Sequence, residues 1–302
     1  MCGIAAFFAK TEAREREIGR WFTPMLDCLT GRGPDSAGFA IYRNPAPSGF
    51  CKLVLQHPEP RFDWAPVAAA LGATNVRVVH NHAVLLVPGE AEARQADVAA
   101  HFPELTLMSA GEVIEIFKEK GLPCEVMQAF ALAEARGSHA IGHTRMATES
   151  AVTTAGSHPF STGCDLCLVH NGSLSNHNRL RRNLQREGIR FRTENDSEVA
   201  AGYLAWRLKQ GDSLEAALEG ALRDLDGFFT FAIGTRDGFA VLRDPIACKP
   251  AILAETDDYV AMASEYRALA HLPGIDQATI WEPEPARIYT WSKNAPASRL
   301  AA

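Results

Sequence analysis

The second half of the chain is dominated by short β-like segments that follow one another in neighbouring pairs. From residue 138 onward they cover residues 138–143, 166–169, 228–234, 239–243, 251–255, 259–263, 279–281 and 287–291. Helical patterns at 174–187, 197–209 and 213–225 interrupt these strands without alternating with each of them. A Rossmann sheet or an (α/β) barrel needs regular strand–helix alternation, whereas paired strands favour antiparallel sheets covered by helices. We therefore predict an α+β fold.

The first part of the chain mixes strand-like and helical patterns. It begins with a buried strand, an amphipathic helix, a loop rich in turn formers and a second strand, at residues 3–8, 15–29, 30–38 and 39–42. Residues 44–136 then contain a strand-like stretch at 75–87, broken near Asn81, and helical patterns at 111–120 and 125–134. No flexible linker separates this segment from its neighbours, so we expect an α/β elaboration of one domain.

Composition and charge narrow the range of functions. The chain has 302 residues, 47% hydrophobic and 22% charged, which is typical of a globular protein with a sizeable core. A formal net charge of −6 suits an enzyme better than a nucleic-acid binder. The sequence contains no glycine-rich nucleotide-binding loop, no apolar run long enough for a membrane span and no secretory signal. The seven cysteines are an odd number spread along the chain, so we expect reduced thiols and a cytoplasmic protein.

Cys2 is the first candidate for chemistry. Removal of the initiator Met1 would leave a thiol and a free α-amine on the same residue. An α-amine titrates near pH 7.7–8.0, so a large fraction of it is unprotonated in the cell and can act as a base for the thiol. The alternative is a cysteine that merely follows Met1 at the start of a buried strand.

Arg145 is the second candidate, within Gly-His-Thr-Arg-Met-Ala-Thr at residues 142–148. An arginine fixed at the end of a strand can bind a carboxylate through two parallel hydrogen bonds. The alternative is a structural ion pair within the protein.

Asn171 and Gly172 are the third, within His-Asn-Gly after the apolar strand 166–169. A side-chain amide beside a glycine N–H supplies two neutral donors that converge on one point, as an oxyanion requires. The alternative is an ordinary Asn-Gly turn.

Asp196 is the fourth candidate, in Asn-Asp-Ser-Glu at residues 195–198, where a helix is predicted to begin. Its carboxylate could hold a substrate ammonium. The alternative is that Asp196 or Ser197 caps the helix.

Two further groups have metal-ligand spacing. Cys164 and Cys167 form a Cys-x-x-Cys pair without a second pair, and His80 and His82 flank Asn81. We interpret the first group as the approach to a strand and the second as a strand or turn, and we expect no metal site.

Taken together, the motifs occur in an order that resembles the class II glutamine amidotransferases, which are glutaminase domains with an N-terminal nucleophile. They are Cys-Gly-Ile, Arg-Gly-x-Asp-Ser-Ala-Gly, His-Thr-Arg-x-Ala-Thr, His-Pro, His-Asn-Gly, Asp-Ser-Glu, Arg-Asp-Pro-x-x-x-x-Pro and Ala-Ser-Glu, at residues 2–4, 32–38, 143–148, 158–159, 170–172, 196–198, 243–250 and 263–265. One departure is Arg-Met-Ala-Thr-Glu-Ser at 145–150, where many members have Arg-Trp-Ala-Thr-His-Gly. That change puts in doubt any loop role taken from the missing Trp or His.

The resemblance implies a single domain over residues 2–302, with the elaboration at about 44–136, folded as a four-layer αββα sandwich of two antiparallel sheets. It implies that Cys2 attacks the γ-amide of L-glutamine and forms a thioester, with release of ammonia. The other roles it implies are the oxyanion donors Asn171 and Gly172, the α-carboxylate ligand Arg145, the α-ammonium ligand Asp196, and the loop-shaping residues Thr148, His158 and Arg32. No cofactor is expected in this chain.

Within the family, the chain looks most like the stand-alone glutaminase subunits of glutamate synthase-like systems, including N-methylglutamate synthase. Only a short stretch follows residue 265, so we expect the ammonia-accepting domain on another polypeptide, a synthase subunit with flavin or iron–sulfur groups. Two alternatives stay open: a stand-alone amidase acting on another γ-glutamyl compound, and a catalytically silent regulatory subunit.

Overall fold

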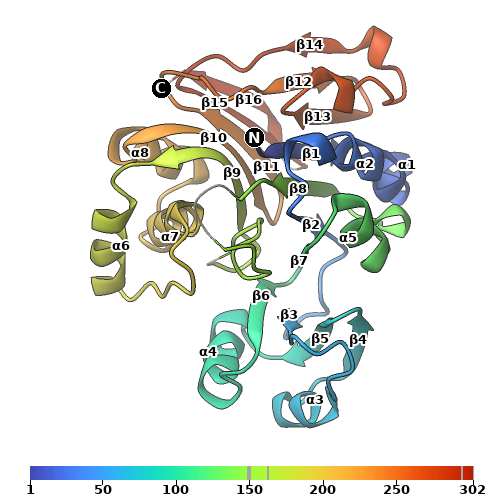
Figure 1. Cartoon of the computed structure of the whole chain (residues 1–302), viewed down its shortest axis with the longest axis vertical. Coiled ribbons are helices and arrows are strands. Elements are labelled where there is room, and N and C mark those ends of the chain that lie inside the picture. The colour runs from blue at the N-terminus through green and yellow to red at the C-terminus, as the bar shows by residue number, and fades with distance from the viewer. Residues whose placement is uncertain (148–150, 162, 294, 302) are drawn as a thin grey trace.

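The chain folds as two large antiparallel sheets packed face to face, with helices outside them and a smaller sheet attached at one end (Figure 1). The computed structural model describes residues 1–147, 151–161, 163–293 and 295–301. Within these ranges, no helix is both long and apolar enough to cross a membrane. The predicted α+β, four-layer αββα arrangement is confirmed.

The first large sheet has seven strands and contains the N-terminal strand near its centre. Its order is β14 (Thr279–Trp281), β12 (Ile252–Glu255), β13 (Tyr259–Ala263), β1 (Gly3–Ala9), β8 (His139–Arg145), β2 (Ser36–Tyr42) and β7 (Ile114–Lys120). All seven residues of β1 are buried, because one face meets the second sheet and the other meets helices. This burial explains why the sequence of β1 is a continuous apolar run rather than an alternating one.

The second large sheet has five strands, in the order β16 (Ala295–Ala301), β15 (Arg287–Ser292), β11 (Gly238–Arg243), β10 (Gly227–Thr235) and β9 (Cys167–Leu174). Side chains of both sheets share one apolar core, in which the Phe239 ring contacts Phe8 and Trp291, with ring centroids 6.0 and 4.9 Å apart. Strand β9 contacts β1 and β8 across this core. The layer order therefore brings the end of β9 close to the start of β1.

Helices cover the outer face of each sheet. The seven-stranded sheet is covered by α2 (Ile18–Asp27) and α5 (Pro123–Ala129), with the short α1 (Glu12–Arg16) beside them. The five-stranded sheet is covered by α6 (His177–Arg186), α7 (Asp196–Lys209) and α8 (Leu214–Asp224), on the opposite side in Figure 1. Single 3₁₀ turns occupy Thr30–Arg32, Leu132–Glu134, Tyr266–Ala268 and Ile275–Gln277.

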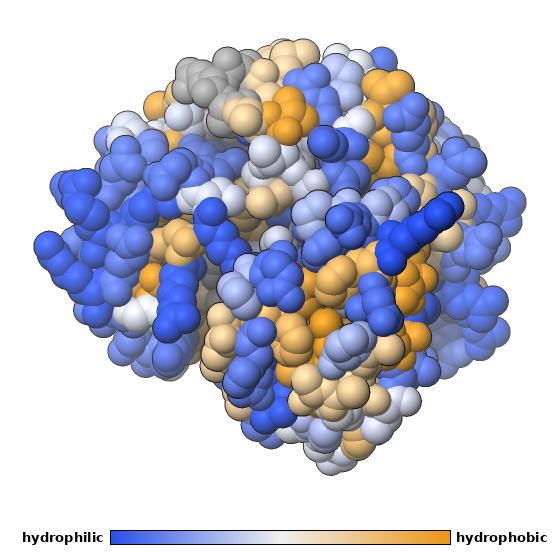
Figure 2. All heavy atoms as spheres, turned by 60° about the horizontal axis from the view of Figure 1, so that its bottom comes forward, coloured by the Kyte–Doolittle hydropathy of each residue, from blue (hydrophilic) through white to orange (hydrophobic). Residues whose placement is uncertain are grey.

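A third sheet of four strands, with two helices, forms what we call the accessory unit. Its strands are β4 (Asn75–Val79), β5 (His82–Pro88), β3 (Phe50–Gln56) and β6 (Thr106–Gly111), and its helices are α3 (Ala65–Leu71) and α4 (Ala91–His101). It has its own apolar cluster and forms the lobe that comes forward in Figure 2, where hydrophobic surface gathers. Val76 and Val78 of the edge strand β4 are 38% and 50% exposed.

The helix predicted at residues 111–120 is wrong, because this segment forms strand β7. Val113, Ile114, Ile116 and Phe117 are spaced as one helix face would be, but all four are buried in the sheet core. The predicted break near Asn81 is confirmed as the turn between β4 and β5, which His80 and Asn81 form. Strand β16 had no counterpart in the prediction.

Asp165 ties the hairpin between β6 and β7 to the segment that leads into β9. Its carboxylate accepts the backbone N–H groups of Glu112, Val113 and Ile114, at 2.9, 2.9 and 3.1 Å. Two of these donors are buried, so they depend on a protein acceptor. One side chain thereby joins the accessory unit to both large sheets.

We expect Asp165→Asn to lower the free energy of unfolding by about 1–3 kcal/mol, because the amide NH₂ cannot accept and leaves at least one N–H unpaired. Urea unfolding followed by circular dichroism measures this change. The exposed Asp257→Asn is the matched control and should leave the midpoint unchanged. Equal midpoints for the two variants would contradict the role assigned to Asp165.

Candidate functional site

Cys2 lies directly before β1, beside the end of β8. The register that pairs Gly3 with Thr144 brings Cys2 next to the residues that follow β8. The backbone N–H of Met146 points at the Cys2 sulfur at 3.4 Å, and the Met146 carbonyl lies 3.7 Å from the same sulfur. These backbone groups hold the thiol in place. Cys2 is only partly buried, so solvent still reaches it.

Arg32 holds the peptide that follows the Cys2 thiol. Its Nε donates to the Cys2 carbonyl oxygen at 2.8 Å, and its Nη1 donates to Glu265 Oε1 at 2.7 Å. Hydrogen bonding by Arg32, with the nearby charge of Arg267, holds the pKa of the Glu265 carboxyl below its usual range. Arg32 is nearly buried, so it fixes the backbone at Cys2.

Asn171 bonds to the same carbonyl from the other sheet, and His143 sets the direction of its amide. His143 Nε2 lies 3.1 Å from Asn171 Oδ1 and 3.2 Å from the His170 carbonyl, both of which are acceptors, so Nε2 carries the proton. Burial lowers the pKa of His143 to about 3, which keeps the ring neutral. Asn171 Nδ2 therefore faces the Cys2 carbonyl oxygen and Ser264 Oγ, both at 3.2 Å.

Gly172 follows Asn171 on β9 with a φ of 149°, which favours glycine. A Cβ atom here would lie 2.0 Å from the Phe228 carbonyl oxygen and 2.6 Å from His170 Nε2. Gly172 is exposed although Asn171 is buried. The pair is thus part of a strand rather than an ordinary Asn-Gly turn, and it presents backbone toward solvent beside the Asn171 amide.

Asp196 is the first residue of α7, and its carboxylate faces β9. Oδ2 accepts the backbone N–H of Leu174 at 2.8 Å, while Oδ1 lies 3.8 Å from His170 Nδ1. Neither Asp196 nor Ser197 caps the helix, because the Asn195 side chain accepts the N–H of Ser197 at 2.9 Å. The interpretation that Asp196 or Ser197 caps the helix is therefore wrong, because the cap is Asn195. The Asp196 carboxylate is not used for capping and is available for another role.

Arg145 ends β8, and its guanidinium is nearly buried. Nη1 donates to the carbonyl of Ala151 at 3.4 Å. Backbone bonding fixes the strand end, because the N–H of Asp35 donates to the Arg145 carbonyl and Asp35 Oδ2 accepts from Ala147 N at 2.8 Å. Arg145 thus leads from the sheet into the segment that contacts Cys2.

His158 packs on the histidine that orients Asn171. Its ring stacks on His143 with centroids 4.1 Å apart and meets Phe160 edge-on at 4.9 Å. Burial, with the charges of nearby basic groups, lowers the pKa of His158 well below its usual value. Thr148, the remaining predicted site residue, lies outside the described residues.

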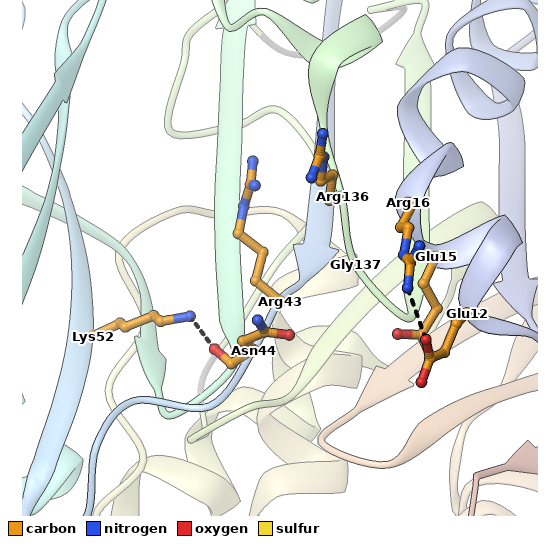
Figure 3. Close-up of a pocket in the computed structure, with 8 residues that line it drawn as sticks. All are labelled: Glu12, Glu15, Arg16, Arg43, Asn44, Lys52, Arg136 and Gly137. Carbon is orange, nitrogen blue, oxygen red and sulfur yellow. Dashed lines mark hydrogen bonds and ion pairs between the residues drawn. The ribbon is translucent and has the colours of Figure 1, made fainter.

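A separate polar hollow of about 640 Å³ lies at the other end of the sheet (Figure 3). It is lined by Glu12, Glu15, Arg16, Arg43, Asn44, Lys52, Arg136 and Gly137. Apart from Lys52, which lies on β3, these residues follow β1 or β2 or precede β8, whereas Cys2 lies where β1 begins. Its charges are partly paired internally, through Arg16 with Glu12 and Lys52 with the Asn44 carbonyl. The hollow is therefore distinct from the surroundings of Cys2.

Two residues of the site, Ser264 and His143, lie in the quoted motifs but had no predicted role. Ser264 Oγ accepts the buried N–H of Ile4 at 2.9 Å as well as one N–H of Asn171, and His143 orients that amide. Ser264 lies in the motif Ala-Ser-Glu and His143 in the motif His-Thr-Arg. Their place in these motifs was the sequence signal that could have identified them.

Of the two groups with metal-ligand spacing, His80 and His82 both bond to Asn81 Oδ1. Cys164 accepts from Gln95 and Cys167 from the Tyr42 hydroxyl.

Comparisons with known proteins agree with the motifs. A family profile described as "Glutamine amidotransferase domain" matches residues 143–271. The glutamine amidotransferase-like protein GlxB of Rhizobium meliloti (strain 1021) is 55% identical over 299 residues, which cover 96% of this chain and 98% of that protein. A putative glutamine amidotransferase of Methanothermobacter thermautotrophicus (strain Delta H) is 31% identical over 305 residues, covering 96% of this chain and 99% of the relative.

Among solved structures, a glutamine phosphoribosylpyrophosphate amidotransferase from B. subtilis superposes with a TM-score of 0.65. The match covers 99% of this chain and 49% of that chain, at 20% sequence identity. At this identity the likeness establishes the fold, an antiparallel α+β sandwich of the N-terminal nucleophile hydrolase type.

Proposed function

Because the chain belongs to the class II glutamine amidotransferases, we propose that it hydrolyses L-glutamine to L-glutamate and ammonia through a thioester on Cys2. The observation that carries the proposal is the set of contacts around Cys2. Its sulfur lies against the residue after Arg145, and its carbonyl accepts from Arg32 and Asn171. Three separated parts of the chain therefore meet at Cys2.

The reaction needs a base, and the Cys2 α-amine supplies it once Met1 is removed. Met1 is 67% exposed, which suits removal by a peptidase. The amine takes the thiol proton, and Sγ forms a bond to the γ-amide carbon of glutamine. The carbon–nitrogen bond then breaks, ammonia leaves with the transferred proton, and water hydrolyses the thioester. Burial keeps His143 and His158 neutral, so neither ring supplies an imidazolium at physiological pH.

The tetrahedral intermediate carries a negative oxygen, for which Asn171 and Gly172 are the proposed donors. Both N–H groups of Asn171 already have acceptors, the Cys2 carbonyl and Ser264 Oγ. One of them must therefore be shared with the oxyanion or pass to it as the charge develops. The exposed backbone of Gly172 is suited to provide the second donor.

Two charged groups suit the ends of a free amino acid. The Arg145 guanidinium is proposed to bind the α-carboxylate, and the Asp196 carboxylate the α-ammonium. Asp196 is held through Oδ2 by Leu174 and keeps 20% of its side chain exposed, so it is fixed and still reachable. Arg32, His158 and Thr148 are proposed to shape the surrounding loops.

We further propose that the ammonia is used by a synthase subunit on another chain, of the glutamate synthase-like or N-methylglutamate synthase type, carrying flavin or iron–sulfur groups. Partner contact is proposed on the accessory unit, because none of the proposed catalytic groups lies there. Its edge strand β4 exposes Val76 and Val78 on one face, and an exposed apolar sheet edge suits a protein interface. The two alternatives are a stand-alone amidase and a silent regulatory subunit.

The nucleophile assignment predicts selective labelling. Mass spectrometry of the mature protein should show that Met1 is absent, and a glutamine analogue with an electrophile at the γ-position should modify Cys2. Cys2→Ser should lose activity while keeping the fold, since an amine activates an alcohol far less readily than a thiol. Cys124→Ser, at an exposed thiol, is the control and should stay active. Labelling at Cys51 or Cys124 instead would overturn the assignment.

Recognition and chemistry should separate in two variants. Arg145→Lys keeps the charge and loses the two-pronged geometry, so it should lower kcat/KM by about ten- to a hundredfold, mainly through KM. Asn171→Ala should lower kcat by a factor on the order of 10², because the charge that Asn171 stabilises develops in the transition state. Steady-state glutaminase kinetics distinguish the two effects.

Ser264→Ala is the control for Asn171, because it leaves the amide in place and removes one of its two acceptors. If Asn171 is an oxyanion donor, Ser264→Ala should lower kcat much less than Asn171→Ala does. Equal losses in the two variants would mean that Asn171 only holds the framework.

Partner dependence is tested with the purified chain and the proteins encoded beside its gene. The isolated chain should be a slow glutaminase that is stimulated by a synthase partner and its acceptor, because loops that close over the site only when the acceptor is loaded keep the enzyme from wasting glutamine. Val78→Lys should weaken stimulation without changing basal activity, whereas Ile280→Lys, an exposed apolar position on β14, should not. Full turnover by the isolated chain and no co-purifying partner would favour the stand-alone amidase.

A further inference from the structure

The segment 151–157 lies between the two groups proposed to bind the ends of glutamine. At one end, Arg145 Nη1 donates to the Ala151 carbonyl at 3.4 Å. At the other, Gly156 O accepts from Asn195 Nδ2 at 3.4 Å, and Asn195 directly precedes Asp196. A shift of this segment would therefore move a hydrogen-bond acceptor of Arg145 and one of Asn195, the residue before Asp196.

Lys118 of β7 holds this segment from one side. Its ammonium donates to the carbonyls of Ser157, Pro159 and Ala155, at 2.7, 3.0 and 3.3 Å, and lies 4.6 Å from the centre of the Phe160 ring. Three carbonyl acceptors match the three N–H groups of an ammonium. Lys118 is 5% exposed, and burial lowers the pKa of its ammonium to about 7. The three carbonyl acceptors offset only part of the cost of burying this charge.

Glu119, the next residue of β7, holds the segment from the other side. Its Oε1 accepts the hydroxyl of Thr154, and its Oε2 accepts Asn81 Nδ2 at 2.6 Å. Successive side chains of a strand point to opposite faces. Strand β7 is the edge strand of its sheet. Lys118 and Glu119 therefore bind residues 151–159 from opposite faces of that edge.

Asn81 belongs to the accessory unit, and its amide is oriented toward Glu119. Its Oδ1 lies 2.9 Å from His80 Nδ1 and 2.8 Å from His82 Nδ1, so both rings donate to it. The amide nitrogen must then face the carboxylate. The turn between β4 and β5 is thereby connected, through Glu119, to Thr154.

We propose that Lys118 and Glu119 are positioning residues for glutamine, and that the accessory unit acts on glutamine binding through Asn81, Glu119 and Thr154. The proposal rests on the proposed glutaminase function. It adds a physical route by which a partner bound to the accessory unit alters the affinity for glutamine.

The test is a split between KM and kcat for glutamine in three variants of the full chain. Thr154→Val keeps the shape and removes the hydroxyl, Asn81→Ala removes the donor to Glu119, and Lys118→Met removes all three N–H groups. Each should raise the KM for glutamine, by about tenfold for Lys118→Met and less for the others, with kcat changed little. Lys118→Arg should restore part of the loss, because it returns a charged donor. Glu112→Gln, in the turn before β7, is the control and should match wild type.

Two further readouts separate positioning from a general loss of stability. Asn81→Ala and Thr154→Val act through the same carboxylate, so their effects on KM should be less than multiplicative in the double variant. Hydrogen exchange of the backbone at 151–160 should accelerate in Thr154→Val and Lys118→Met and stay unchanged in Glu112→Gln. This measurement needs no activity, and its result for Thr154→Val remains decisive if Lys118→Met folds poorly.

An unchanged KM in Thr154→Val, or independent effects of Asn81→Ala and Thr154→Val, would overturn this inference while leaving the glutaminase intact. An inactive wild-type protein, with and without partner, would instead overturn the proposed function.

Discussion

The site depends on one backbone carbonyl, that of Cys2. It accepts from Arg32, in a loop beside the seven-stranded sheet, and from Asn171, on the five-stranded sheet. A peptide held by donors from two directions has little freedom to rotate, so the thiol on the same residue keeps its place. This matters at a chain terminus, where the first residues of a domain are usually poorly ordered unless tied down. The two sheets are therefore needed together to fix Cys2, the proposed nucleophile.

A layer of neutral polar groups supports this arrangement. His143 donates to Asn171, His158 stacks on His143, and His170 Nδ1 lies 2.9 Å from Ser197 Oγ. Because the rings are uncharged, they direct hydrogen bonds without adding charge near the thiol. The charged groups, Arg145 and Asp196, lie at strand and helix ends, where the ends of a zwitterion could meet them.

The sequence motifs predicted which residues meet, and periodicity predicted most of the elements. Motifs such as His-Asn-Gly predict the site well because local structure restricts the residue type at each position. At Gly172, for example, a Cβ atom would collide with the Phe228 carbonyl. Periodicity failed at 111–120, where an apolar run buried on both faces of β7 has the spacing of a helix face. The hydrogen bonds from Lys118 to carbonyls of residues 155–159 could not be predicted. Their acceptors are backbone atoms, which every residue has, so no residue type in the sequence indicates them.

The buried histidines also set how the fold responds to acid. Burial lowers the pKa values of His82, His139 and His143 to about 3, against about 6.5 in an unfolded chain. Between these values the unfolded chain binds more protons, so the stability these neutral rings allow is complete above about pH 6.5 and declines as the pH falls toward 3. Each ring contributes a slope of about 1.4 kcal/mol per pH unit. Imidazoles buried in the core thus make the folded state less stable as the pH falls.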